Sequence, residues 1–119
     1  MKALLNQYIL RKGIPVAEPD VNKWLVWMAQ HDDQRVVKKQ QVGTYEVSTV
    51  FLGINHNFNP TGPAIVWETM VFGGDKGIFQ HRQNRCSGSR EQAQAMHARM
   101  VTKVREFLNS KTKPNESAV

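Results

Sequence analysis

Cysteine, long apolar runs and paired metal ligands are all scarce in this sequence of 119 residues. Its one cysteine, Cys86, has no partner for an internal disulfide. The four histidines are scattered singly, without a Cys-x-x-Cys or His-x-x-x-His pair, so no metal site is predicted. No run of about 18 apolar residues is present to cross a membrane, and the start of the chain is too polar for a secretory signal. We therefore expect a cytoplasmic protein with no metal and no other cofactor.

Positive charge, +6 in total at pH 7, is concentrated late in the sequence. Residues 1–75 carry seven Lys or Arg and seven Asp or Glu, whereas residues 76–113 carry nine basic residues against two acidic ones. Any acidic partner should therefore be bound by the later part of the chain, with Arg90, Arg99 and Lys103 on or near the outer side of its helix. Sequence-independent binding of nucleic acid through residues 76–113 is one interpretation. A solvated face that keeps the protein in solution is the other.

Two apolar segments in the middle of the chain, residues 45–54 and 64–72, predict the strands of a long β-hairpin. Both segments are rich in β-branched and aromatic residues, and they are bounded by Gly, Pro and Asn. In residues 64–72 the odd and even positions point to opposite faces, and both sets contain large apolar side chains. This strand should therefore lie inside the sheet, with cover on both faces at least locally.

The remaining elements complete an α+β fold in one domain, residues 1–109, followed by a disordered tail over residues 110–119. We expect an antiparallel sheet of about four to five strands, with the last helix packed on it. The predicted elements are an edge hairpin over residues 8–16, a helix from Asp20 to about residue 31, an edge strand over 35–42, a more polar strand over 78–86, and an amphipathic helix from Ser89 to Leu108.

Glu68 is the carboxylate that this fold should desolvate, because it lies between Val66 and Met70 on one face of its strand. Burying an unpaired charge costs on the order of several kcal/mol, so a partner is expected. A symmetric loop sets Arg82 opposite Glu68 as a structural salt bridge. His97 on the last helix is the other candidate, and a Glu68–His97 contact could orient the imidazole for proton transfer. The third alternative is that the carboxylate reaches solvent.

The loop over residues 55–63 is the second candidate site. It is longer than a hairpin requires, and its Asn, Gly and Pro residues are also typical of turn chemistry alone. Long polar loops with a central aromatic residue often form binding surfaces. On that interpretation the binding residues are His56, Asn57 and Phe58.

Three segments form a characteristic pattern: residues 47–58 (VSTVFLGINHNF), 62–74 (GPAIVWETMVFGG) and 89–97 (SREQAQAMH). The pattern resembles a widespread family of small proteins encoded by bacteriophages and prophages, and the likeness covers most of residues 8–104. The Lys12-Gly13 turn is a departure, because such proteins often have Asp-Gly there. The resemblance implies a viral accessory protein acting inside a bacterial cell, but no particular activity.

Three functions follow as expectations. The first is a non-enzymatic accessory protein that binds a macromolecule of the bacterial host, in a role of the host-takeover or anti-defence type. The alternatives are a basic protein associated with nucleic acid, and a small hydrolase that uses Glu68 and His97.

Overall fold

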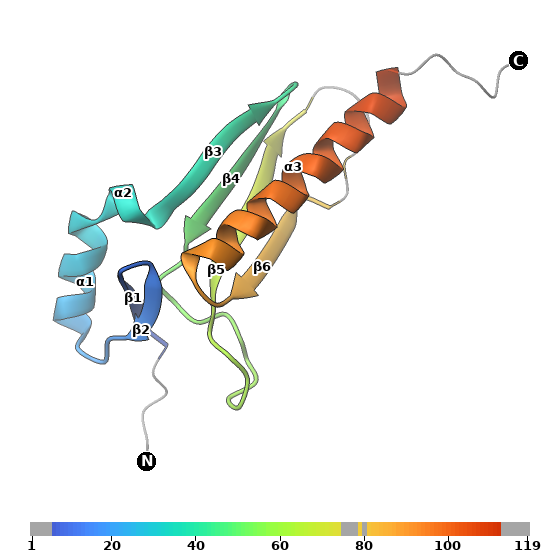
Figure 1. The fold of residues 1–119 in the computed structure, drawn as a ribbon. Coiled ribbons are helices and arrows are strands. Elements are labelled where there is room, and N and C mark those ends of the chain that lie inside the picture. The colour runs from blue at the N-terminus through green and yellow to red at the C-terminus, as the bar shows by residue number, and fades with distance from the viewer. Residues whose placement is uncertain (1–5, 75–78, 80, 113–119) are drawn as a thin grey trace, which may run out of the picture.

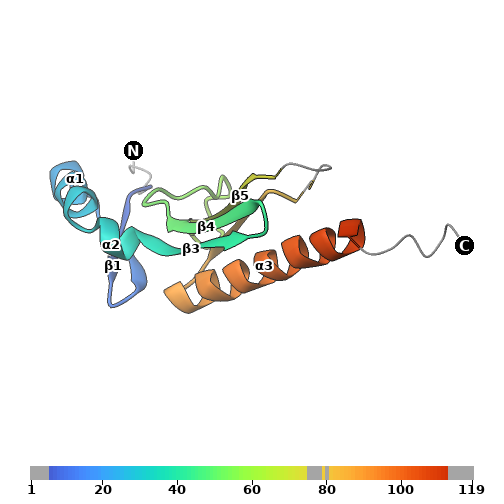
Figure 2. The same ribbon diagram turned by 90° about the horizontal axis from the view of Figure 1, so that it is seen from above.

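The fold centres on a four-stranded antiparallel sheet with the strand order β3-β4-β5-β6. A computed structural model describes residues 6–74, 79 and 81–112. The long helix α3 (Arg90–Thr112) lies against one face of the sheet (Figures 1 and 2). These features confirm the predicted α+β class and the predicted packing of the last helix. The strands are β3 (Val36–Val42), β4 (Tyr45–Phe51), β5 (Ile65–Gly73) and β6 (Gln83–Ser87).

The N-terminal elements form a smaller unit at one end of the sheet (Figure 1). The strands β1 (Tyr8–Arg11) and β2 (Ile14–Ala17) pair with each other as a separate two-stranded sheet. Lys12 and Gly13, with φ of 52° and 76°, form the tight turn between them. The helices α1 (Val21–Gln30) and α2 (Asp32–Arg35) then lead into β3.

Helix α1 is capped as its sequence predicts but is buried less than its periodicity suggests. The Asp20 Oδ1 atom accepts hydrogen bonds from the backbone N–H groups of Asn22 and Lys23 at 2.9 and 3.1 Å. No residue of α1 is buried, and Val21 and Leu25 of its apolar face are exposed. The reason is that α1 packs mainly against β1 and α2 and does not contact the large sheet extensively.

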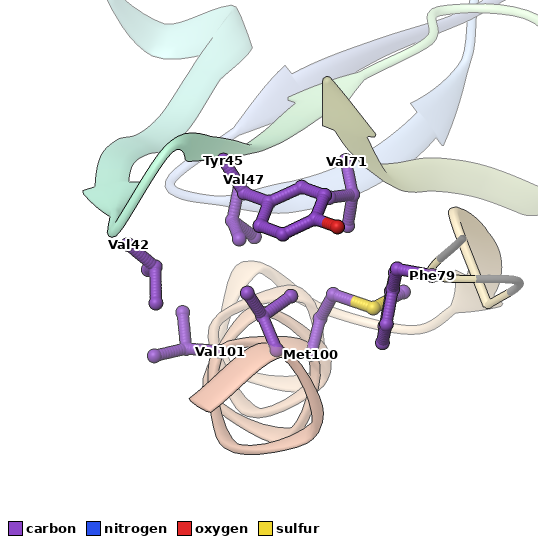
Figure 3. Close-up of a cluster of buried hydrophobic side chains, with 8 residues drawn as sticks. Val42, Tyr45, Val47, Val71, Phe79, Met100 and Val101 are labelled. Carbon is purple, nitrogen blue, oxygen red and sulfur yellow. The ribbon is translucent and has the colours of Figure 1, made fainter. Parts of the chain in front are cut away.

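The main core lies between the sheet and α3. Odd-numbered positions of β4 and β5 point toward the helix, and Trp67, Thr69 and Val71 are almost completely buried there. Figure 3 shows one of the two apolar clusters, in which side chains of the sheet meet Met100 and Val101 of α3. On the other face of β5, Val66 and Glu68 are buried but Phe72 is 47% exposed. The predicted cover on both faces is therefore present only along part of the strand.

Two predicted element boundaries differ from the structure. The last strand begins at Gln83, whereas it was predicted from residue 78: Phe79 lies in the core cluster with Met100 of α3 and not in the strand, and residues 75–78 and 80 lie outside the described part of the chain. Helix α3 begins with the predicted contact between Ser89 and Gln92, whose Oε1 atom accepts from the Ser89 N–H at 2.7 Å. It continues to Thr112, three residues into the segment predicted as a tail from residue 110, and residues 113–119 lie outside the described part of the chain. No helix within the described residues is long and apolar enough to span a membrane.

Candidate functional site

Glu68 is buried and paired, as expected, but its partner is Arg85. The Glu68 Oε2 atom accepts hydrogen bonds from Arg85 Nε and from Gln83 Nε2, each at 2.7 Å. The Glu68 side chain is only 11% exposed, whereas that of Arg85 is 40% exposed. One end of this ion pair is therefore desolvated, and the other remains in contact with water.

The predicted salt bridge between Glu68 and Arg82 is wrong. In the observed register Glu68 lies opposite Arg85, three residues further along the chain than a symmetric loop would place its partner. Arg82 precedes β6, and its guanidinium donates to the backbone carbonyls of Val71 and Gly73 at 3.1 and 2.8 Å. Arg82 therefore holds the start of β6 against the end of β5.

A chain of buried hydrogen bonds connects α3 to the three strands β3, β4 and β5. His97 is 3% exposed, and its Nδ1 and Nε2 atoms lie 2.7 Å from Thr49 Oγ1 and 3.1 Å from Gln40 Oε1. Thr49 Oγ1 is in turn 2.6 Å from Thr69 Oγ1. The Gln40 carbonyl oxygen can only accept, so Nε2 carries the imidazole proton. Nδ1 then accepts from the Thr49 hydroxyl, which itself accepts from Thr69.

The environment of His97 favours its neutral form. Burial lowers the pKa of His97 below its usual value of 6.5, and the positive charge of Lys38 lowers the pKa further. A neutral imidazole with one donor and one acceptor satisfies the hydrogen-bond chain described above. His97 thus has a structural role that fully explains its burial.

The structure does not bring Glu68 and His97 together. Thr69, the neighbour of Glu68, points toward α3 and belongs to the His97 network. Successive side chains of a strand point to opposite faces, so Glu68 is directed away from α3. The candidate catalytic pair is therefore separated by the sheet, and this geometry gives no support to the hydrolase hypothesis.

The loop over residues 55–63 is ordered by its own asparagines. The Asn55 side-chain oxygen accepts from the N–H groups of Asn57 and Ile65, and the Asn57 oxygen accepts from the N–H group of Asn59, at 2.8 to 2.9 Å. These are the local side-chain-to-backbone bonds that fix turns. Phe58 lies between them and is 94% exposed.

The other predicted loop residues have supporting positions. The His56 Nδ1 atom lies 2.9 Å from the carbonyl oxygen of Ile54, and the Asn57 side-chain amide donates to the carbonyl of Pro63 at 2.8 Å. Both side chains therefore stabilise the loop. Of the three predicted loop residues, Phe58 is the one whose side chain is directed almost entirely to solvent.

The three predicted basic residues do not form one surface. Arg90 donates to the backbone carbonyls of Gln34 and Val36 at 2.7 and 3.2 Å, and so ties the start of α3 to the start of β3. Arg99 lies on the β6 side of α3, where its charge opposes the rise in the pKa of Cys86 that burial causes. Lys103, four residues later, lies on the same flank as Arg99.

A groove between β3 and α3 was not predicted from the sequence. It has a volume of about 430 Å³, and its lining includes Lys38 and Gln40 from the strand and Gln94 and Arg105 from the helix. No local spacing links these side chains, because they meet only when α3 packs on the sheet. Side chains alternate between the two faces along β3, which places Gln40 on the same face as the buried Val42. This alternation is the one signal in the sequence that could have indicated the groove.

Within the described residues, no group of three or more His, Cys, Asp or Glu side chains could hold a metal ion. Comparisons of the chain with protein-family models, curated proteins and solved structures found no match.

Proposed function

We propose that this protein is a non-enzymatic phage or prophage accessory protein that acts by binding a macromolecule of the bacterial host. The observation that carries the proposal is Phe58, a large apolar side chain that is 94% exposed at an ordered loop. The phage assignment rests on the resemblance of residues 47–58, 62–74 and 89–97 to that family. The host cytoplasm is the compartment in which such a protein would act.

The loop geometry favours binding because the backbone that carries Phe58 is held in place before any partner arrives. The side-chain oxygens of Asn57 and Asn59, on the two sides of Phe58, accept backbone hydrogen bonds, so little backbone entropy remains to be lost on association. Burying a phenylalanine side chain contributes roughly 1.5–3 kcal/mol. An exposed, preorganised aromatic residue is a common anchor in protein interfaces.

The alternatives have less support. A hydrolase would need Glu68 and His97 on one side of the sheet. A nucleic-acid interface would need Arg90, Arg99 and Lys103 on one surface, and Arg90 is engaged in hydrogen bonds within the fold. A protein partner recognised through the loop is therefore the form of the proposal that we favour.

A pull-down from bacterial lysate at low salt tests the proposal. Tagged wild-type protein should retain a specific host component, and Phe58→Ser should lose most of it. Phe72→Ser is the matched control, because it also removes a phenylalanine that is 47% exposed, but from β5. If no component is retained, or if Phe58→Ser retains it unchanged, the proposal is wrong. Capture of nucleic acid that survives Phe58→Ser would favour the nucleic-acid alternative.

A further inference from the structure

The groove between β3 and α3 combines a free sheet edge with a basic lining. Among the residues that the structure describes, β3 is an edge strand of the sheet and pairs with β4 alone (Figure 1). Helix α3 runs below β3 in the view of Figure 2. The walls between them include Lys38 and Gln40 from β3, and Gln94, Ala98, Thr102 and Arg105 from α3.

The backbone of β3 has hydrogen-bonding groups that point away from the sheet. Val42 and Tyr45 are paired across the two-residue Gly43–Thr44 turn, which makes them a hydrogen-bonded pair of the ladder. The pairing alternates along an antiparallel ladder, so the N–H and C=O groups of Lys39 and Gln41 point outward. An extended peptide can pair with groups arranged in this way and add one strand to the sheet.

The charge of the groove indicates which peptide would fit. Lys38 and Arg105 are charged lining residues, and no Asp or Glu is among the lining residues in the described part of the chain. Lysines on an edge strand disfavour pairing with uncharged or basic strands. A second copy of β3 would place lysine beside lysine, whereas an acidic strand offers complementary charge.

We infer that the β3–α3 groove binds an extended acidic peptide of a partner protein, which pairs with the outward edge of β3 while its carboxylates lie near Lys38 and Arg105. Nucleic acid fits this groove less well, because no Phe, Tyr or Trp is among the described residues that line it, and the one lining imidazole, His97, is buried and hydrogen-bonded within the fold. This site is separate from Phe58, so the inference does not depend on the loop's being a binding surface.

Fluorescence anisotropy with a synthetic peptide of eight residues, alternating Glu and Val, tests the inference on the full chain. We expect the peptide to bind at low salt, and Lys38→Gln and Arg105→Gln each to weaken binding several-fold. The matched control is Arg99→Gln, which removes an exposed arginine from the opposite flank of α3 and should leave affinity unchanged. Phe58→Ser should also leave affinity unchanged, which separates this test from that of the loop.

Two further probes distinguish strand addition from simple attraction of an anion. Methylation of the peptide's backbone nitrogens keeps its charge but removes its donors, and should abolish binding. Hydrogen exchange of the Lys39 and Gln41 amides should slow when the unmethylated peptide is added. The inference is overturned if the acidic peptide does not bind at millimolar concentration, or if the methylated peptide binds equally well. Tighter binding of a single-stranded oligonucleotide that is lost in Arg105→Gln would also overturn it, in favour of a nucleic-acid site.

Discussion

Thr49 is the central residue of the buried polar network, and its replacement by valine tests whether that network stabilises the fold. Valine has nearly the same shape as threonine, so packing is retained while one hydroxyl is lost. Thr49 and Thr69 are completely buried, and His97 is 3% exposed, so water cannot readily replace the missing group. Thr49→Val leaves the Nδ1 atom of His97 and the hydroxyl of Thr69 without the partner they have in the structure.

The expected cost of Thr49→Val follows from these two orphaned groups. Each buried unsatisfied polar group costs about 1–3 kcal/mol, so for two groups we expect a loss of about 2–6 kcal/mol in the free energy of unfolding. At about 4 °C per kcal/mol for a domain near this size, the melting temperature should fall by roughly 8–24 °C. Urea unfolding followed by circular dichroism measures the same loss as a lower midpoint.

Two variants make the test of Thr49→Val specific. Thr102→Val makes the same chemical change at an exposed position of α3 and should alter stability by no more than about 0.5 kcal/mol. Thr49→Val combined with Thr69→Val should cost less than the sum of the two single changes, because the second change removes one of the orphaned hydroxyls. If Thr49→Val unfolds at the same urea concentration as Thr102→Val, the network contributes no stability and the reasoning is refuted.

Three further predictions follow from the structure. A double-mutant cycle with Glu68→Gln and Arg85→Met should give a coupling energy of about 1–3 kcal/mol in urea unfolding, and a value near zero would contradict the observed pairing. Because the pKa of His97 is lowered on folding, the unfolded chain binds the proton more readily, and stability should fall as pH drops through about 6.5 and be level above it. The difference in urea midpoint between wild type and His97→Gln, measured from pH 8 to pH 5, should shrink accordingly, and a constant difference would be evidence against the lowered pKa. Gly74→Ala should cost at least about 1 kcal/mol, since Gly74 has φ of 89° and an added Cβ would clash with the ring of Tyr45. An unchanged melting temperature would rule out this strain.

The strands of the central hairpin could be predicted because their signals are local. β-branched and aromatic residues mark β4 and β5, and alternation along β5 indicates its two faces. The partner of Glu68 could not be predicted, because the register between β5 and β6 depends on how many residues belong to the connection between the two strands. Phe79 lies in the core and not in β6, and a shift between Ile65 and Trp67 adds a further irregularity.

In the candidate sites, too, features set by neighbouring residues could be predicted, whereas contacts between distant segments could not. Local turn chemistry around the asparagines indicated an ordered loop with Phe58 at its surface. His97 was a candidate partner of Glu68, but its partners in the structure are Thr49 of β4 and Gln40 of β3. The groove between β3 and α3 exists only after the helix docks, so no segment read by itself could reveal it.

The polar contacts of Glu68 and Thr69, neighbours on β5, favour one pairing register of this strand. Glu68 forms an ion pair on one face of the sheet, and Thr69 joins the His97 network on the other. A slip of one residue would turn Glu68 toward α3 and Thr69 away from it, which would bury a carboxylate without Arg85 and break the hydrogen bond to Thr49. An unpaired buried charge costs several kcal/mol, whereas a paired one often adds little net stability. Glu68 and Thr69 are therefore expected to make the slipped register costly, in addition to the stability that their hydrogen bonds contribute in the correct one, although the other buried positions of the sheet are largely apolar.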